Sequence, residues 1–113
     1  MSYEQLQSCI DACLRCAKEC EHCSNSCLTG RNSSQSEWTR LTRDCAQVCL
    51  TAASLMCRDS RFSQDICRLC AECCEMCAQQ WEQNRQQLDQ CQPCADACRE
   101  CAEQCHRIVG VTV

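Results

Sequence analysis

The chain has 113 residues, 19 of which are cysteine, and a formal net charge of -4. Leu, Ile, Val and Phe together make up about 14 % of it, whereas a fold supported by hydrophobic burial normally needs at least about 20 %. Cys and Ala supply most of the other apolar side chains, and their small size limits the apolar area that they remove from water. We therefore expect a further source of stability besides the hydrophobic core.

The composition argues against several classes of protein. The positive charges are scattered along the chain and do not form the basic patch of a nucleic-acid-binding protein. The sequence contains no run of 18 apolar residues, so no membrane span is predicted. Residues 1–5 lack the basic and apolar regions of a secretory signal. We expect a cytoplasmic protein, whose thiols stay reduced or bind metal. The odd number of cysteines also argues against a closed disulfide framework.

The first half of the chain predicts two helices separated by a polar turn. The first is expected over residues 3–28, with Gly30 as its C-terminal stop. The second is expected to follow Ser36 as N-cap and to end near Arg58.

The second half predicts two more helices. The third is expected to follow Ser63, with Phe62 as a possible staple residue, and to end near residue 86. The fourth follows Asp89 and ends before Gly110, with Pro93 near its N-terminus, where proline is tolerated.

The cysteines recur mostly at alternating steps of three and four residues, the spacing of one helix face. In the four segments they are Cys9, Cys13, Cys16, Cys20, Cys23 and Cys27; Cys45, Cys49 and Cys57; Cys67, Cys70, Cys73, Cys74 and Cys77; and Cys91, Cys94, Cys98, Cys101 and Cys105. The step is never two, which excludes a strand. Residues 1–113 are therefore predicted to form one all-α domain, an antiparallel up-down-up-down four-helix bundle with a cysteine-lined core.

Such a core favours metal binding over a structural role, because Cys is a small hydrophobe and a poor replacement for Leu. Residues at i and i+4 lie about 5–6 Å apart at Cβ, so two sulfurs such as those of Cys16 and Cys20 can flank one ion. Met56 and Cys57 are in phase at one end of the bundle, and Met56 is interpreted either as core filler or as a soft thioether that assists Cu(I) uptake. We expect all the cysteines to be metal ligands, with His106 as a further candidate at the bundle end.

Charge selects the metal. Buried thiolates need compensation, and a monovalent ion per thiolate leaves the filled core near neutral. A tetrahedral zinc site of four thiolates carries two negative charges, and a row of such sites would repel. Soft thiolates with no imidazole or carboxylate among them select Cu(I). Multiple Cu(I) ions are therefore the predicted cargo, and zinc or cadmium buffering is the alternative.

The same pattern resembles the cytosolic group of the cysteine-rich four-helix-bundle copper storage proteins. The motifs that carry the resemblance cover residues 9–27, 44–49, 66–77 and 94–105. The resemblance implies storage of many Cu(I) ions inside the bundle, often in a homotetramer. Trp81 stands where some relatives continue the cysteine stripe, and the Gln-rich connection after it replaces a stretch in which relatives can place His.

Two functions of other classes remain open at this point. Cys67, Cys70, Cys73 and Cys77 have the spacing of a bacterial ferredoxin motif, but Ala78 follows where that motif has Pro. A thiol redox sensor would need one partly exposed cysteine with a lowered pKa. No Cys-His pair or Ser-His-Asp arrangement is placed for catalysis, so we do not expect an enzyme.

Overall fold

The structure, a computed structural model, describes residues 1–26 and 33–110, with the side chains of the second range described from residue 37 onward. Its helices are α1 (Tyr3–Ser26), α2 (Ser33–Cys57), α3 (Ser63–Gln83), the short 3₁₀ helix η2 (Asp89–Cys91) and α4 (Gln92–Val109). No strand occurs in these ranges. The predicted all-α fold is therefore confirmed.

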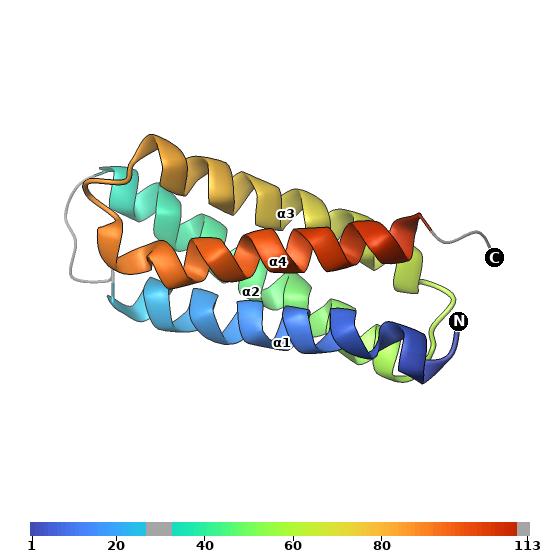
Figure 1. The fold of residues 1–113 in the computed structure, drawn as a ribbon. Helices are drawn as coiled ribbons and strands as arrows, with labels where there is room; N and C mark the ends of the chain where they lie inside the picture. The colour runs from blue at the N-terminus through green and yellow to red at the C-terminus, as the bar shows by residue number, and fades with distance from the viewer. Residues whose placement is uncertain (27–32, 111–113) are drawn as a thin grey trace.

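The four long helices run alternately up and down. Each packs against the next along the chain, and α4 packs back against α1, which closes an elongated bundle of 45 × 20 × 18 Å (Figure 1). The N-terminus and the C-terminal end of α4 lie at the same end of the bundle (Figure 1). The topology predicted from the cysteine periodicity is confirmed.

Two predicted helix starts are wrong. α2 begins at Ser33, so Ser36 lies within its first turn, and several serines in this stretch are equally suited to begin a helix. α3 includes Ser63, and Phe62 precedes it with no side-chain cap. The Ser63 hydroxyl is buried and has no hydrogen-bond partner among the described residues.

The other boundaries lie closer to the prediction. α2 ends at Cys57, beside the predicted Arg58, and Asp59 follows with a φ of 49°, a conformation that Asp tolerates better than most residues. α3 ends at Gln83, three residues early, and η2 separates it from α4, whose first turn holds Pro93. The predicted end of the first helix at Leu28 lies outside the described residues.

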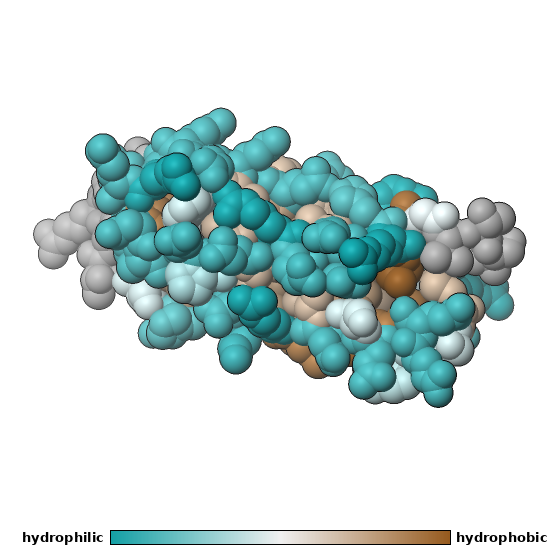
Figure 2. Space-filling view, viewed as in Figure 1, coloured by the Kyte–Doolittle hydropathy of each residue, from teal (hydrophilic) through white to brown (hydrophobic). Residues whose placement is uncertain are grey.

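Sulfur and small side chains fill the interior. Buried alanines such as Ala46, Ala71 and Ala95 lie among the cysteines, and small side chains let helix axes approach closely. The visible surface is mostly hydrophilic, with scattered apolar residues (Figure 2). Within the described ranges, no helix combines the length and the hydropathy needed to cross a membrane.

The two ends of the bundle differ in their larger side chains. At one end Trp38, Trp81 and Leu88 are buried, and we call this the tryptophan end. The Trp81 indole N–H donates to the Leu88 carbonyl oxygen at 2.7 Å. At the opposite end Leu6 and Met56 are buried, and we call this the methionine end.

Candidate metal centre

The inward cysteines form four overlapping groups of sulfur atoms. Within each group all sulfurs lie within 4.8 Å of one another. From the methionine end inward, the groups are Cys9, Cys67 and Cys105; Cys13, Cys70, Cys101 and Cys105; Cys16, Cys49, Cys74 and Cys101; and Cys16, Cys20, Cys45 and Cys98. We call these residues together the sulfur core. Every member is buried.

Neighbouring groups share ligands. Cys105 belongs to the first two groups, Cys101 to the second and third, and Cys16 to the third and fourth. A thiolate has several lone pairs and bridges two metal ions when both lie within bonding distance. The sulfur core is therefore one continuous row of donors rather than four separate sites.

The spacing of the sulfurs suits metal ions with few ligands. Cys13 and Cys101 are 3.6 Å apart, Cys70 and Cys101 3.7 Å, and Cys16 and Cys20 3.9 Å, each between the Sγ atoms. Two bonds of about 2.3 Å, the zinc–sulfur length, place their sulfurs about 4.0 Å apart at a trigonal angle. Trigonal coordination therefore requires only small movements of the side chains.

Contacts within a helix and contacts between helices both build these groups. The intrahelical pairs Cys16/Cys20 and Cys45/Cys49 are in contact, at 3.9 and 4.0 Å. The shortest contacts between free thiols in the described structure, at 3.6 Å, join different helices, as between Cys45 and Cys74. The i, i+4 spacing predicts which face the cysteines occupy, and cross-helix packing determines which sulfurs meet.

Hydrogen bonds between the thiols shift their pKa values in opposite directions. Hydrogen bonds with the thiols of Cys16 and Cys20 lower the pKa of Cys45. Hydrogen bonds with Cys101 and its neighbours raise the pKa of Cys74, and burial raises it further. Each proton is thus held between close sulfurs, and a soft cation that replaces it meets donors already converging on one point.

Several predicted ligands lie outside these groups. Cys77 and Cys94 are buried toward the tryptophan end, and the Cys94 sulfur is 3.6 Å from that of Cys20. Cys73 is half-buried, and burial raises its pKa to about 11. Cys57 is exposed at the end of α2. Cys27 lies outside the described residues.

Cys23 and Cys91 are joined by a disulfide at the tryptophan end. The bond connects α1 to η2, and the Trp38 indole N–H donates to the Cys23 sulfur at 3.1 Å. The expectation that all thiols stay free does not hold for this pair, because two in-phase cysteines from different elements meet here. The sequence signals that each faces inward but not that they meet. Their role as ligands stays a prediction for the reduced protein.

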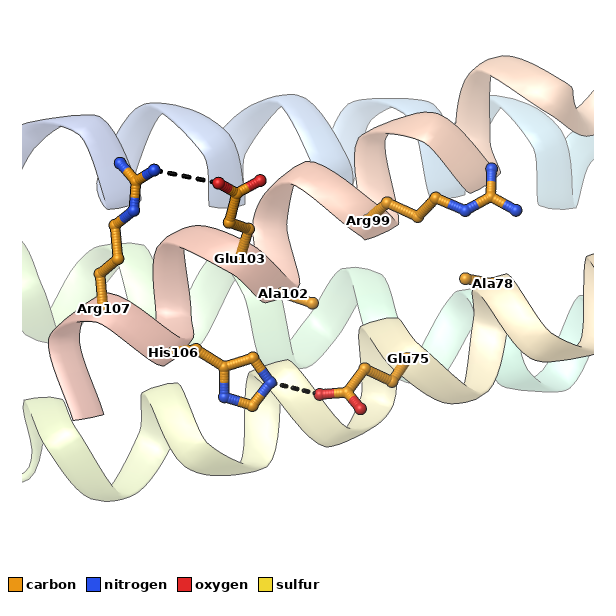
Figure 3. A pocket seen from close by; sticks show the side chains of 7 residues that line it. All are labelled: Glu75, Ala78, Arg99, Ala102, Glu103, His106 and Arg107. Carbon is orange, nitrogen blue, oxygen red and sulfur yellow. Dashed lines mark hydrogen bonds and ion pairs between the residues drawn. The ribbon is translucent and has the colours of Figure 1, made fainter. Parts of the chain in front are cut away.

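His106 lies on the surface, although it follows Cys105 directly. Its imidazole points toward α3, where Nε2 is 2.5 Å from a Glu75 carboxylate oxygen (Figure 3). The shallow groove around it is lined by charged side chains and alanines, such as Arg99 and Ala102. No group of metal-ligating side chains in the described residues includes His106, so its role as a ligand stays a prediction.

The four cysteines with ferredoxin-like spacing can also be placed in the structure. Cys67, Cys70, Cys73 and Cys77 all lie on the continuous helix α3. Cys67 and Cys70 contribute to two different groups of the sulfur core, and Cys73 to none. These four sulfurs do not converge around one cluster.

Three comparisons with known proteins agree with this geometry. A family model described as Csp, copper storage protein, matches residues 2–110. The cysteine-rich protein YhjQ of Bacillus subtilis (strain 168), described as uncharacterised, is 44 % identical to this chain over 67 residues. The match covers 58 % of this chain and 62 % of that protein, which is less than two thirds of its length.

Solved structures share the whole fold. The Cu(I)-bound copper storage protein BsCsp3, from Bacillus subtilis, is 40 % identical, with a TM-score of 0.84 over 94 % of this chain and 99 % of that chain. A cytosolic copper storage protein from Streptomyces lividans, in a structure with five coppers, is 28 % identical, with a TM-score of 0.89 over 98 % of this chain and 97 % of that chain.

Proposed function

This chain belongs to the copper storage protein family, and we propose that its sulfur core stores many Cu(I) ions as cargo. The observation that carries the proposal is the sharing of Cys105, Cys101 and Cys16 between neighbouring groups of buried sulfurs. Shared thiolates allow ions to be bound in a continuous row. The function is storage in the cytoplasm, without catalysis, and residues 1–113 act as a single domain.

Charge explains why the cargo is Cu(I). Each protonated thiol of the apo core loses its proton when it becomes a ligand, and one monovalent ion for each thiolate leaves the filled core near neutral. A divalent ion held by four thiolates carries two excess negative charges, and adjacent groups in the sulfur core share only one ligand with each neighbour. Burying that excess charge costs several kcal/mol per site or more, so zinc fills the row less readily.

The proposal is tested by titrating the fully reduced protein with Cu(I) against a strong Cu(I) chelator, without oxygen. We expect more than about ten ions per chain, because about one ion per thiolate neutralises the core. Reactivity of the thiols toward Ellman's reagent should fall in step. Zn(II) under the same conditions is the matched control and should bind in smaller number. Uptake of only one or two Cu(I) ions would contradict storage.

The Cys23–Cys91 disulfide is the one observation that favours a thiol redox function instead. A redox sensor uses one reactive pair and leaves its other thiols idle. Mass spectrometry after mild oxidation distinguishes the two functions, because a sensor forms one dominant reversible disulfide and binds little copper. A storage protein retains its copper capacity in all groups of the sulfur core.

A homotetramer is part of the proposal through the family resemblance. Size-exclusion chromatography with light scattering measures the assembly directly, in the reduced apo and copper-loaded forms. A mass of about four chains is the expected result.

A further inference from the structure

The thioether of Met56 is in contact with the sulfur core. Met56 is fully buried near the end of α2, and the Cys67 thiol donates to its Sδ atom at a sulfur–sulfur distance of 3.5 Å. Cys67 belongs to the terminal group with Cys9 and Cys105, whose sulfurs are 3.7 Å apart. The thioether therefore adds a fourth sulfur beside three thiols.

The terminal group lacks a thiol from one helix. Farther inside, the group of Cys16, Cys49, Cys74 and Cys101 takes one cysteine from each of the four helices. The terminal group takes Cys9 from α1, Cys67 from α3 and Cys105 from α4, and none from α2.

Met56 stands at the missing position. It lies seven residues after Cys49, which is one heptad, so the two side chains occupy the same face of α2. Cys57, the cysteine of α2 nearest in sequence, is exposed and belongs to no group of the described residues. The α2 donor closest to the terminal group is therefore a thioether.

We propose that Met56 is the α2 ligand of a terminal Cu(I) site that it shares with Cys9, Cys67 and Cys105. The site rests on the proposed storage function and extends it to a mixed thiolate–thioether ligand set. Thioether and thiolate are both soft donors that select Cu(I). The Met56–Cys67 spacing is close to the distance of about 4.0 Å between two sulfurs on one trigonal ion.

The chemistry of the thioether gives this site a distinct role. A thioether has no proton to lose and adds no negative charge, whereas each thiolate binds a cation through its full charge. The terminal ion is therefore held less tightly than the ions bound by thiolates alone, and it exchanges first with an external acceptor. The methionine end then serves as the exchange site of the stored copper.

The test labels the protein with selenomethionine and records selenium-edge X-ray absorption of the copper-loaded protein. The chain has three methionines, and Met76, which is 49 % exposed on α3, is the matched control. We expect a selenium–copper scattering path in the unsubstituted protein and in Met76→Leu, and its loss in Met56→Leu.

The outcomes separate this proposal from storage itself. Full copper uptake without a selenium–copper path in the unsubstituted protein overturns the Met56 site and leaves the storage function intact. A path that persists in Met56→Leu has the same meaning. Uptake of one or two ions contradicts storage. Absence of a path in the unsubstituted protein overturns the Met56 site even if Met56→Leu fails to fold.

Met56→Cys gives an independent kinetic readout. The new thiolate should hold the terminal ion more tightly, so a chelator should remove the first copper ion at least tenfold more slowly than from the unsubstituted protein. Met76→Cys is the control and should leave this rate unchanged. Equal rates of release in both variants would overturn the exchange role.

Discussion

Cys101 lies near the centre of the bundle and contacts thiols of several helices. From α4 its sulfur lies 3.6 Å from that of Cys13, 3.7 Å from that of Cys70 and 4.0 Å from that of Cys49, so it reaches all three other helices. It also belongs to two groups of the sulfur core. Loss of this one sulfur should therefore affect more than one ion.

We expect Cys101→Ser to lower the copper capacity by at least two ions per chain. Serine keeps nearly the same shape but offers a hard oxygen that binds Cu(I) poorly. The measurement is the chelator titration described above, with circular dichroism to verify that the helices are intact. The control, Cys57→Ser, replaces an exposed cysteine outside the groups and should lower the capacity by one ion at most. Equal losses in the two variants would mean that the ions do not share Cys101.

The inward position of residues such as Cys16 and Cys49 can be predicted from the sequence, because alternating steps of three and four keep side chains on one helix face. The same logic identifies Cys73 as off-phase, and it is half-buried. The meeting of Cys23 and Cys91 depends on how far α1 and α4 are shifted along each other, which no local pattern records. The sequence indicates Met56 as a candidate soft donor. Its contact with Cys67 joins two different helices and could be found only from the structure.

At the scale of the elements, the disulfide fixes the end of α1 to η2, directly before the start of α4. It links residues 68 positions apart, so α2 and α3 lie within the closed loop, whereas most of α1 precedes it and α4 follows it. A cross-link of that span removes conformational entropy from the unfolded chain, and such bonds typically contribute about 2–4 kcal/mol. The oxidised apo protein should therefore owe part of its stability to this bond, since its core is formed by small side chains.

We expect Cys23→Ser to reduce the free energy of unfolding of the oxidised apo protein by about 2–4 kcal/mol. Urea denaturation monitored by circular dichroism measures the difference. The control is the same pair of proteins in excess dithiothreitol, where the bond is absent from both and the difference should largely vanish. A difference that persists undiminished under reduction would place the effect in packing around Trp38 rather than in the cross-link.

At the scale of the whole molecule, loading with copper is an exchange of protons for cations. Hydrogen bonding with Cys16 raises the pKa of Cys98, and burial raises it further, so this thiol is protonated at neutral pH. Hydrogen bonding with Cys20 lowers the pKa of Cys94 to about 5, so Cys94 contributes little proton release at that pH. The thiols with raised pKa values, such as Cys98 and Cys74, therefore set the pH dependence.

The sign of that dependence follows from competition. A thiol whose pKa is raised holds its proton as the pH falls, and Cu(I) must displace it, so the apparent copper affinity should increase with pH across the neutral range. We expect release of between about half and one proton per Cu(I) bound at pH 7, since one monovalent ion replaces about one thiol proton. Calorimetric titration in two buffers of different ionisation enthalpy, with the same Cu(I) donor complex, measures the number. Release close to zero would mean that the apo core already holds thiolates, and neutrality of the filled row could then no longer explain its preference for a monovalent ion.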